Sequence, residues 1–417
     1  MADFIAQLGN IQNQGLLPLE QRLNTLPIGQ NPYITGASLP ANSPLFFGRQ
    51  RELHDILSVL RQPNKPSSVS LLGERRIGKS SLLNQIFQEL NKEDKLCAVF
   101  ATAQNFSELT EQTFFKSLKQ SISQVVNPDL IENETVSYDN LRDYIHSLAK
   151  QGYRFVIMID EFEKLSGNPE FKTSFFSHLR ALGERPEFRL GYVIASRHAL
   201  KDLCRSHKIE ESSFWNIFGT QKILGLLTEK EASDLWIKPM LATLSNKITE
   251  QYLIKNLHNV TDLSGYHPMF IQIIASQFWN AWSGGFNISK IELKVNLRQF
   301  MEDLFYQRSQ ENKTEWEMLL KVAAEKTIDH NYIFNELYLR GLILKDGKVF
   351  CPYFAEVIKE ECKTANGKSV ETLLDEVEKG LETGINKVDK FFDLFLKAAN
   401  VSGKIRKEFL EPDKNDE

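Results

Sequence analysis

Hydrophobic residues in the first half of the chain follow two patterns. Short continuous apolar runs are typical of strands in a sheet that is covered on both faces. They occur at Val69–Leu72, Leu96–Thr102, Arg154–Ile159 and Arg189–Ala195. Between these runs, apolar residues recur every three or four positions, which predicts helices over residues 50–60, 81–90, 108–126, 138–151 and 171–182. Strands that alternate with helices in this way predict a parallel sheet in an α/β fold.

The second half of the chain has few strand-like runs. Helical spacing covers residues 228–239, 249–257, 269–282 and 298–306, and a loop is expected at Leu263–Pro268. Two further helices, over 314–325 and 331–340, precede a strand pair that turns at Asp346-Gly347, a common hairpin turn. Helix, helix and hairpin in this order predict a winged helix.

The apolar run that begins at Val69 leads into Gly-x-x-x-x-Gly-Lys-Ser, ending at Lys79 and Ser80. Between a strand and a helix, this pattern predicts a phosphate-binding loop, because its glycines let consecutive backbone N–H groups converge on one anion. Lys79 would reach the β- and γ-phosphates of a nucleotide, and the Ser80 hydroxyl would bind Mg²⁺. The predicted cofactor-binding residues of the loop are Gly73, Glu74, Arg75, Arg76, Ile77, Gly78, Lys79, Ser80 and Ser81. The two arginines could bind phosphate or pair with a nearby acidic group.

Two carboxylates, Asp160 and Glu161, close the apolar strand that begins at Arg154. Downstream of a phosphate-binding loop, this arrangement predicts that Asp160 holds Mg²⁺ through water and that Glu161 orients and polarises the attacking water. Glu163 is expected to be a solvated neighbour. Arg197 follows the next strand, and because the carboxyl ends of parallel strands face the ligand, it could sense the γ-phosphate. The predicted catalytic residues are Glu161, Lys79 and Arg197, and the predicted metal ligands are Ser80 and Asp160.

Composition and charge restrict the remaining possibilities. A chain of 417 residues is long enough for several domains, and its net charge of -4 gives no global argument for nucleic-acid binding. The four cysteines lie far apart without metal-ligand spacing, which favours reduced thiols in a cytoplasmic protein. Residues 1–30 lack the basic start and apolar core of a signal peptide, and no run has the length of a membrane span.

The predicted winged helix lacks the usual features of a DNA reader. Its second helix, over residues 331–340, carries Arg340 as its only cation and is otherwise aromatic, apolar or uncharged, apart from Glu336. A positive face that follows the phosphate backbone is therefore not evident. We expect a packing module that closes over a nucleotide.

Together these motifs resemble STAND-type P-loop ATPases, the signalling ATPases related to AAA+ proteins and NB-ARC modules, over about residues 31–362. The resemblance implies an α/β P-loop core followed by a small helical domain, a winged helix and, here, a helical tail. It places near the adenine Asn31, Pro32, Tyr33, Phe47, Gly48 and Arg49. It also implies that Pro268 contacts the base from the helical domain and that Arg197 is a sensor arginine. His330 is a weak candidate for the phosphate-binding histidine of some winged helices.

The predicted domains follow from these motifs. They are an N-terminal extension (1–43), a P-loop ATPase core (44–222, with 31–36 on the adenine side), a helical lid domain (223–310), a winged-helix domain (311–363) and an amphipathic helical tail (364–417).

The resemblance implies a switch that binds ATP or ADP with Mg²⁺, hydrolyses ATP slowly and self-assembles when ATP is bound, often in prokaryotic stress signalling or antiviral defence. No effector domain is recognisable before residue 31 and no repeat sensor after the winged helix, so we expect a protein partner in trans. The alternative is an initiator-like AAA+ ATPase that binds DNA through the winged helix.

The tail is predicted to form an amphipathic helix or helical pair over residues 369–399. Four apolar residues recur every seven positions: Leu374, Leu381, Val388 and Phe395. Gly380 and Gly384 each cost about 1 kcal/mol of helix stability, which argues against a long autonomous coiled coil. The segment would fold back on its own chain or dock on a second copy or a partner. Deleting residues 367–417 is expected to leave ATP binding intact and to remove assembly or partner capture.

Overall fold

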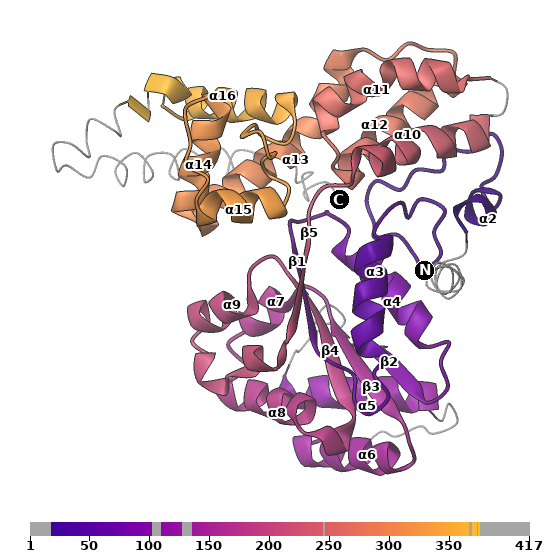
Figure 1. The fold of residues 1–417 in the computed structure, drawn as a ribbon, viewed down its shortest axis with the longest axis vertical. Coiled ribbons are helices and arrows are strands. Elements are labelled where there is room, and N and C mark those ends of the chain that lie inside the picture. The colour runs from indigo at the N-terminus through magenta and orange to yellow at the C-terminus, as the bar shows by residue number, and fades with distance from the viewer. Residues whose placement is uncertain are drawn as a thin grey trace, which may run out of the picture. The chain divides into compact units, whose positions relative to one another are not determined.

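The computed structural model describes residues 18–101, 110–126, 136–244, 247–366, 369–372 and 374–375. The chain divides into two compact units, Met1–Leu227 and Thr228–Glu417. The first contains a parallel sheet and the second is built mainly of helices (Figure 1).

Five parallel strands form the sheet of the first unit. They are β1 (Val69–Gly73), β2 (Leu96–Phe100), β3 (Arg154–Ile159), β4 (Leu190–Ser196) and β5 (Thr220–Leu224). Their order is β2-β3-β4-β1-β5, so β4 lies between the strand of the glycine loop and the strand with the acidic end. Strands β1–β4 confirm the four predicted apolar runs, although Thr102 lies outside the described residues. The sequence analysis did not predict β5, whose residues are only partly buried.

Helices cover both faces of this sheet, with α3 and α4 on one side and α5 to α9 on the other (Figure 1). Their bounds are α3 (Gln50–Leu60), α4 (Lys79–Leu90), α5 (Glu111–Val126), α6 (Tyr138–Lys150), α7 (Phe162–Ser166), α8 (Thr173–Glu184) and α9 (Leu200–Ser206), and short 3₁₀ turns lie at 186–188, 210–212 and 214–217. The residues that predicted α3 by their spacing, such as Ile56 and Leu60, are fully buried. An aromatic cluster supports the second face, where Phe114 meets Phe175 edge to face at 5.1 Å between ring centroids. This packing fixes the ends of β3 and β4.

An extended segment that precedes α3 runs along α4. Arg22, in the short helix α2 (Leu19–Leu23), is buried and donates hydrogen bonds to the carbonyl oxygens of Ser43 (2.6 Å) and Phe46 (2.8 Å). Farther along, the amide of Leu39 donates to Ser81 Oγ at 2.9 Å and Asn84 Nδ2 donates to the Leu39 carbonyl at 2.8 Å. The chain before α3 is therefore anchored to the helix that follows the glycine loop.

The described helices of the second unit are α10 (Glu229–Leu244), α11 (Glu250–Ser264), α12 (Pro268–Ser283), α13 (Lys290–Glu311), α14 (Lys313–Ala323), α15 (Tyr332–Leu339) and α16 (Pro352–Asn366). The predicted loop at Leu263–Pro268 is wrong at both ends, because α11 continues to Ser264 and α12 begins at Pro268. Gly265 then ends the helix with a φ of +55°, and a side chain there would come within 2.4 Å of the Phe350 carbonyl oxygen. The chain needs glycine at this position.

Helices α14 and α15 follow one another as predicted, and a hairpin with a single antiparallel bridge, between Ile343 and Val349, stands in place of the predicted strand pair. Helix α16, which the sequence analysis did not predict, comes after this hairpin. Arg340 ends α15, and its side chain is buried and paired with Glu315 of α14. The only cation of residues 331–340 is therefore not on the surface. The winged-helix interpretation itself stays a prediction.

Only the start of the predicted tail lies within the described residues. Val370 and Leu374 are buried, and Lys326 pairs with Asp375, so this start packs against the rest of the second unit. Residues 376–417, with most of the predicted tail helix, lie outside the described part of the chain.

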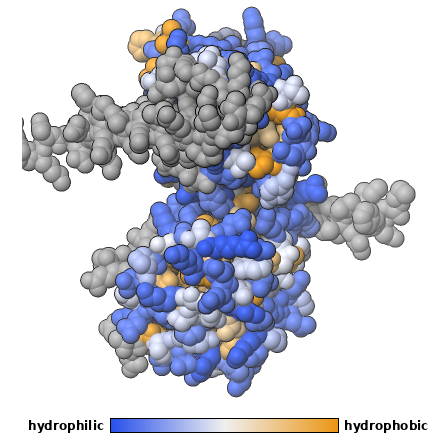
Figure 2. Space-filling view, turned by 90° about the vertical axis from the view of Figure 1, so that its left-hand side faces the viewer, coloured by the Kyte–Doolittle hydropathy of each residue, from blue (hydrophilic) through white to orange (hydrophobic). Residues whose placement is uncertain are grey.

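The described residues on the face that Figure 2 shows are mainly hydrophilic. On the face in Figure 2, hydrophobic residues form small scattered patches. The described helices include none that is long and apolar enough to cross a membrane. Exposed large hydrophobic residues include Tyr332, Tyr338 and Leu339 on α15.

Candidate functional site

The glycine loop joins β1 to α4, and both of its glycines are required by the backbone. A side-chain carbon at Gly73 would lie 2.9 Å from Ile77 Cγ2 and 2.9 Å from the Leu224 carbonyl oxygen. Gly78 has a φ of +106°, a conformation that residues with a side chain rarely adopt. Helix α4 starts at the next residue, so its unpaired first-turn amides lie beside the loop. The loop has the form that cradles a phosphate.

Lys79 lies inside this loop. Its ammonium is buried and donates hydrogen bonds to the carbonyl oxygens of Gly73 (2.8 Å) and Glu74 (2.9 Å). Burial lowers the pKa of Lys79, and the nearby carboxylates of Glu163, Glu74 and Asp160 partly oppose this shift. A desolvated cation at the start of a helix is a strong attractor for an anion that enters the loop.

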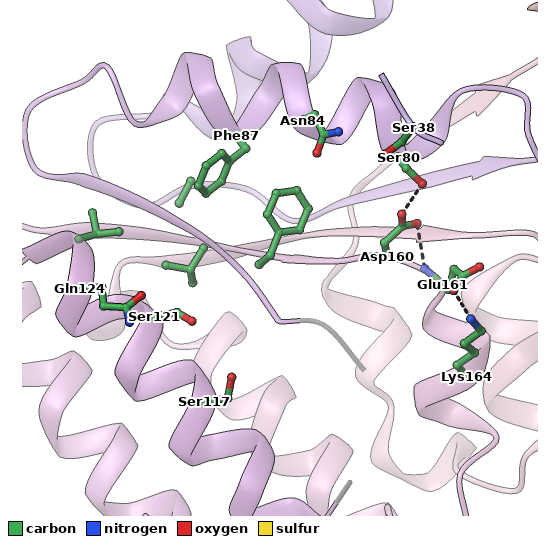
Figure 3. A pocket seen from close by; sticks show the side chains of 14 residues that line it. Ser38, Ser80, Asn84, Phe87, Ser117, Ser121, Gln124, Asp160, Glu161 and Lys164 are labelled. Atoms are coloured by element: carbon green, nitrogen blue, oxygen red, sulfur yellow. Dashed lines mark hydrogen bonds and ion pairs between the residues drawn. The ribbon is translucent and has the colours of Figure 1, made fainter. Parts of the chain in front are cut away.

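Two oxygen-bearing side chains that could bind a metal, Ser80 at the start of α4 and Asp160 at the end of β3, lie in contact. The Ser80 hydroxyl donates to Asp160 Oδ2, while Asp160 Oδ1 accepts a hydrogen bond from the Glu161 amide at 2.9 Å (Figure 3). The structure therefore brings the two predicted metal ligands together. Hydroxyl and carboxylate oxygens suit Mg²⁺, which usually takes one or two carboxylates and completes its shell with phosphate and water. The described residues contain no group of three His, Cys, Asp or Glu side chains that could hold a metal alone.

Glu161 occupies a strained position at the junction of β3 and α7. Its φ of +51° is uncommon for a residue with a side chain, and such strain tends to occur at functional sites. The carboxylate pairs with Lys164 one turn later in α7, and both side chains are more than a third exposed (38% and 53%). Glu161 therefore faces open space beside Asp160 (Figure 3).

Arg197 and Glu163 form an ion pair at the same sheet edge. Arg197 Nε lies 2.8 Å from Glu163 Oε1, and the side chains are 27% and 14% exposed. The expectation that Glu163 is a solvated neighbour is wrong, because the end of the adjacent strand β4 brings Arg197 against it.

A cavity of about 490 Å³ extends from these carboxylates along β2. Ser80, Asp160 and Glu161 line one end, and Asn84 and Phe87 of α4 line it farther along (Figure 3). The sequence analysis missed the lining residues of α5: Ser117, Ser121, Gln124 and Val125. The first three are four and three positions apart, so a polar stripe on one face of α5 was the available signal.

The residues predicted on the adenine side have mainly internal contacts. Arg49 Nη2 donates to the carbonyl oxygens of Gly225 (2.5 Å) and Ile77 (3.4 Å), which ties the loop to the segment after β5. Tyr33 and Phe47 are buried, and Asn31 Oδ1 accepts from the Tyr33 amide at 3.1 Å. Pro32 is partly buried, and Gly48 has a φ of +67°. Their contact with a base stays a prediction.

The other loop residues fall into two groups. Glu74, Ile77 and Ser81 are buried, and the Ser81 hydroxyl accepts the bond from Leu39 that was described above. Arg75 and Arg76 are exposed, and their binding to phosphate or to a nearby acidic group stays a prediction.

Pro268 belongs to the second unit, where it is the first residue of α12. His267 before it is buried and stacks on Phe270 at 4.1 Å, which agrees with a structural histidine at a helix start. His330 stacks on Phe334 at 4.0 Å. The proposed contacts of Pro268 with a base and of His330 with a phosphate stay predictions.

Comparison with known proteins agrees with this geometry. Residues 46–187 match the model of an ATPase domain found predominantly in Archaea. A Walker-type ATPase of Pyrococcus abyssi is 14% identical, with a TM-score of 0.55 over 78% of this chain and 98% of its own. The ORC2 protein of Aeropyrum pernix, solved with ADPNP and ADP, is 13% identical, with a TM-score of 0.50 over 79% of this chain and 97% of its own. A search of curated proteins found no match.

The chain has the fold of Walker-type P-loop ATPases. The predicted fold class is confirmed for the α/β P-loop core and the helical region that follows it. Because the solved structures are less than 25% identical, the likeness to them extends to the fold, and the chemistry rests on the residues of this site.

Proposed function

We propose that the chain binds ATP and ADP together with Mg²⁺ at the ends of β1, β3 and β4 and hydrolyses ATP. The observation that carries this proposal is the convergence of one loop cation, one hydroxyl–carboxylate pair and one strand-end arginine. Lys79, the Ser80–Asp160 pair and Arg197 come from three different parts of the chain. Phosphoryl transfer depends mainly on positioning and on charge stabilisation, and these residues can provide both.

Each residue has a definite role in this proposal. Lys79 binds the β- and γ-phosphates in place of the loop carbonyls that it now contacts. Ser80 and Asp160 hold Mg²⁺, which neutralises phosphate charge when it is bound. Glu161 orients and polarises the attacking water, and Arg197 contacts the γ-phosphate. The glycine loop supports this assignment, because Gly73 packs too closely on Ile77 and Leu224 to carry a side chain and Gly78 has a φ of +106°, which gives the loop the tight turn that directs backbone amides at an anion.

Hydrolysis is proposed to be slow and regulatory, as in a STAND-type switch. Two ion pairs support this, because Glu161 is paired with Lys164 and Arg197 with Glu163. Both groups must leave these partners before they act on the γ-phosphate and its water. In this proposal the nucleotide state controls self-assembly or the binding of a protein partner, and the predicted helical lid and winged helix respond to it.

Calorimetry tests the site directly. We expect ADP and a non-hydrolysable ATP analogue to bind the full chain with one site each, and Mg²⁺ to strengthen the binding of the analogue. Light scattering with and without the analogue then tests assembly. Absence of binding of either nucleotide at millimolar concentration would overturn the proposal, whereas binding without a change in mass would overturn only the assembly step.

A second candidate is an initiator-like ATPase that binds DNA. The likeness of fold to the ORC2 protein of Aeropyrum pernix favours it. The surface of α15 does not, because Arg340 is buried against Glu315 and the exposed residues include Tyr332 and Leu339. We therefore place this function second.

A further inference from the structure

The ion pair between Glu163 and Arg197 follows from the order of the strands. β3 and β4 are hydrogen-bonded neighbours with Ile159 opposite Ile194, so the chain leaves both strands at the same edge. Glu163 lies in the first turn after β3, and Arg197 is the first residue after β4. The guanidinium nitrogen Nε and the carboxylate oxygen Oε1 lie 2.8 Å apart.

Glu163 has capacity for a second cation. Its Oε1 contacts Arg197, but its other oxygen, Oε2, is buried and has no hydrogen-bond partner within the described part of the chain. Among the charges that act on Lys79, the carboxylate of Glu163 has the largest effect, and it raises the pKa that burial lowers. Glu163 thus pairs with one of the two cations that are proposed to bind phosphate and acts electrostatically on the other, although it belongs to neither the glycine loop nor the Asp160-Glu161 pair.

We propose that Glu163 holds Arg197 while no triphosphate is bound and that the γ-phosphate then displaces it. This inference rests on the nucleotide site proposed above. Glu163 is a positioning residue, because it acts through Arg197 and takes no part in the chemistry. A γ-phosphate must break the ion pair, whereas ADP brings no anion to Arg197. The pair therefore weakens ATP binding relative to ADP binding and sets the preference of the chain between the two nucleotides.

A purely structural ion pair would behave differently. If Glu163 and Arg197 only fastened α7 to the end of β4, removing the carboxylate would lower stability and change the affinity for both nucleotides alike. The ratio of the two dissociation constants separates the possibilities. Glu163 also acts on Lys79, which is proposed to contact the β-phosphate of both nucleotides and the γ-phosphate of ATP alone. A shift of the ratio that acts through Lys79 would persist when Arg197 is replaced, so the Arg197→Met background separates the two routes.

The test is a double-mutant cycle read by calorimetry on the full chain with Mg²⁺. The dissociation constants of ADP and of a non-hydrolysable ATP analogue are measured for wild type, Glu163→Gln, Arg197→Met and the double variant. We expect Glu163→Gln to shift the ratio towards the ATP analogue by about fivefold or more, the lower end of usual coupling between sites. In the Arg197→Met background, Glu163→Gln should leave the ratio unchanged. Glu170→Gln, an exposed glutamate before α8, is the matched control.

The outcomes distinguish this inference from the proposed function. If wild type binds neither nucleotide, the site itself is wrong. If wild type binds both and Glu163→Gln leaves the ratio unchanged, or the shift persists without Arg197, the role of Glu163 is overturned while the site stands. Thermal unfolding checks that each variant folds. If Glu163→Gln does not fold, Glu163→Asp weakens the same pair and should shift the ratio in the same direction by a smaller factor.

Discussion

Each of the two units contains a largely buried ion pair of a glutamate and an arginine. The two pairs differ in how exposed the side chains are and in how many carboxylate oxygens the arginine contacts. In the second unit, Arg340 Nη1 lies 3.3 Å from each carboxylate oxygen of Glu315, and the side chains are 4% and 9% exposed. In the first unit, Arg197 engages one oxygen of Glu163, and the arginine is 27% exposed. The Glu315 pair joins α15 to α14, whereas the Glu163 pair lies at the edge of a sheet beside Lys79.

This difference indicates what each pair contributes. A closed, desolvated pair adds little net stability, but its loss is expensive because the remaining charge has no counterion. A half-engaged pair next to a second buried cation can exchange its anion for a ligand at lower cost. We therefore expect the Glu315 pair to determine the stability of the second unit and the charges around Lys79 to determine ligand binding.

The largest expected effect is on nucleotide affinity. Lys79→Ala removes the buried ammonium that lies within the loop, so the phosphates lose their main cation. We expect the dissociation constants of ADP and an ATP analogue to rise about 10³-fold, or about 4 kcal/mol, in calorimetry. Lys150→Ala, at the exposed end of α6, is the control. Unchanged affinity would exclude the glycine loop as the site.

The second prediction concerns stability. Arg340→Ala leaves the Glu315 carboxylate buried without its arginine and is expected to lower the free energy of unfolding of the second unit by about 3 kcal/mol. Denaturant titration measures this change, and nucleotide affinity should be unaffected if the first unit is intact. Lys345→Ala, on the exposed hairpin, should be neutral. A decrease of less than about 0.5 kcal/mol in the free energy of unfolding for Arg340→Ala would show that the pair does not determine the stability of the second unit.

The third prediction separates binding from hydrolysis. Glu161→Gln keeps the shape of the side chain and leaves the Ser80–Asp160 pair in place, but it removes the group that polarises water. We expect nucleotide affinity within about twofold of wild type and a fall of about 100-fold in phosphate release, the lower end for a lost general base. Glu187→Gln, an exposed glutamate in the turn before β4, serves as the control. Hydrolysis at the wild-type rate would mean that the base is assigned wrongly.

The sequence predicted much of the first unit because its signals are local. Strands β1–β4 are continuous apolar runs, and the glycine loop and acidic strand end can be identified from adjacent residues. Strand β5 was missed because Thr220–Leu224 contains three polar residues and is only partly buried. The role of Glu163 depends on β4 lying beside β3, which is a matter of strand order. Local sequence carries no direct signal for that order, and so the residue was expected to be solvated.

The same limit applies to the second unit. Spacing predicted α10–α15, but it could not show that Arg340 turns inward to Glu315. The arginine ends α15 four residues after Glu336, so the sequence allowed an exposed position. Only the packing of α15 against α14 decides between the two.

The smallest expected effect is on DNA. The phosphate backbone supplies most of the affinity of a DNA-binding protein through lysine and arginine contacts, and each contact makes binding more sensitive to salt. Helix α15 itself contains no lysine or arginine. Arg340, the residue that follows it, is buried and paired with Glu315. We therefore expect duplex DNA at physiological salt to bind with a dissociation constant above about 10 μM, within or above the range of non-specific binding, and with little change when salt is lowered.

Replacing the exposed Asn335 and Tyr338 with arginine should create measurable, salt-dependent affinity if α15 can reach a groove. Fluorescence anisotropy with labelled duplex measures both. Nanomolar, salt-sensitive binding by wild type would instead place the DNA contacts elsewhere on the chain and favour the initiator-like function over the switch.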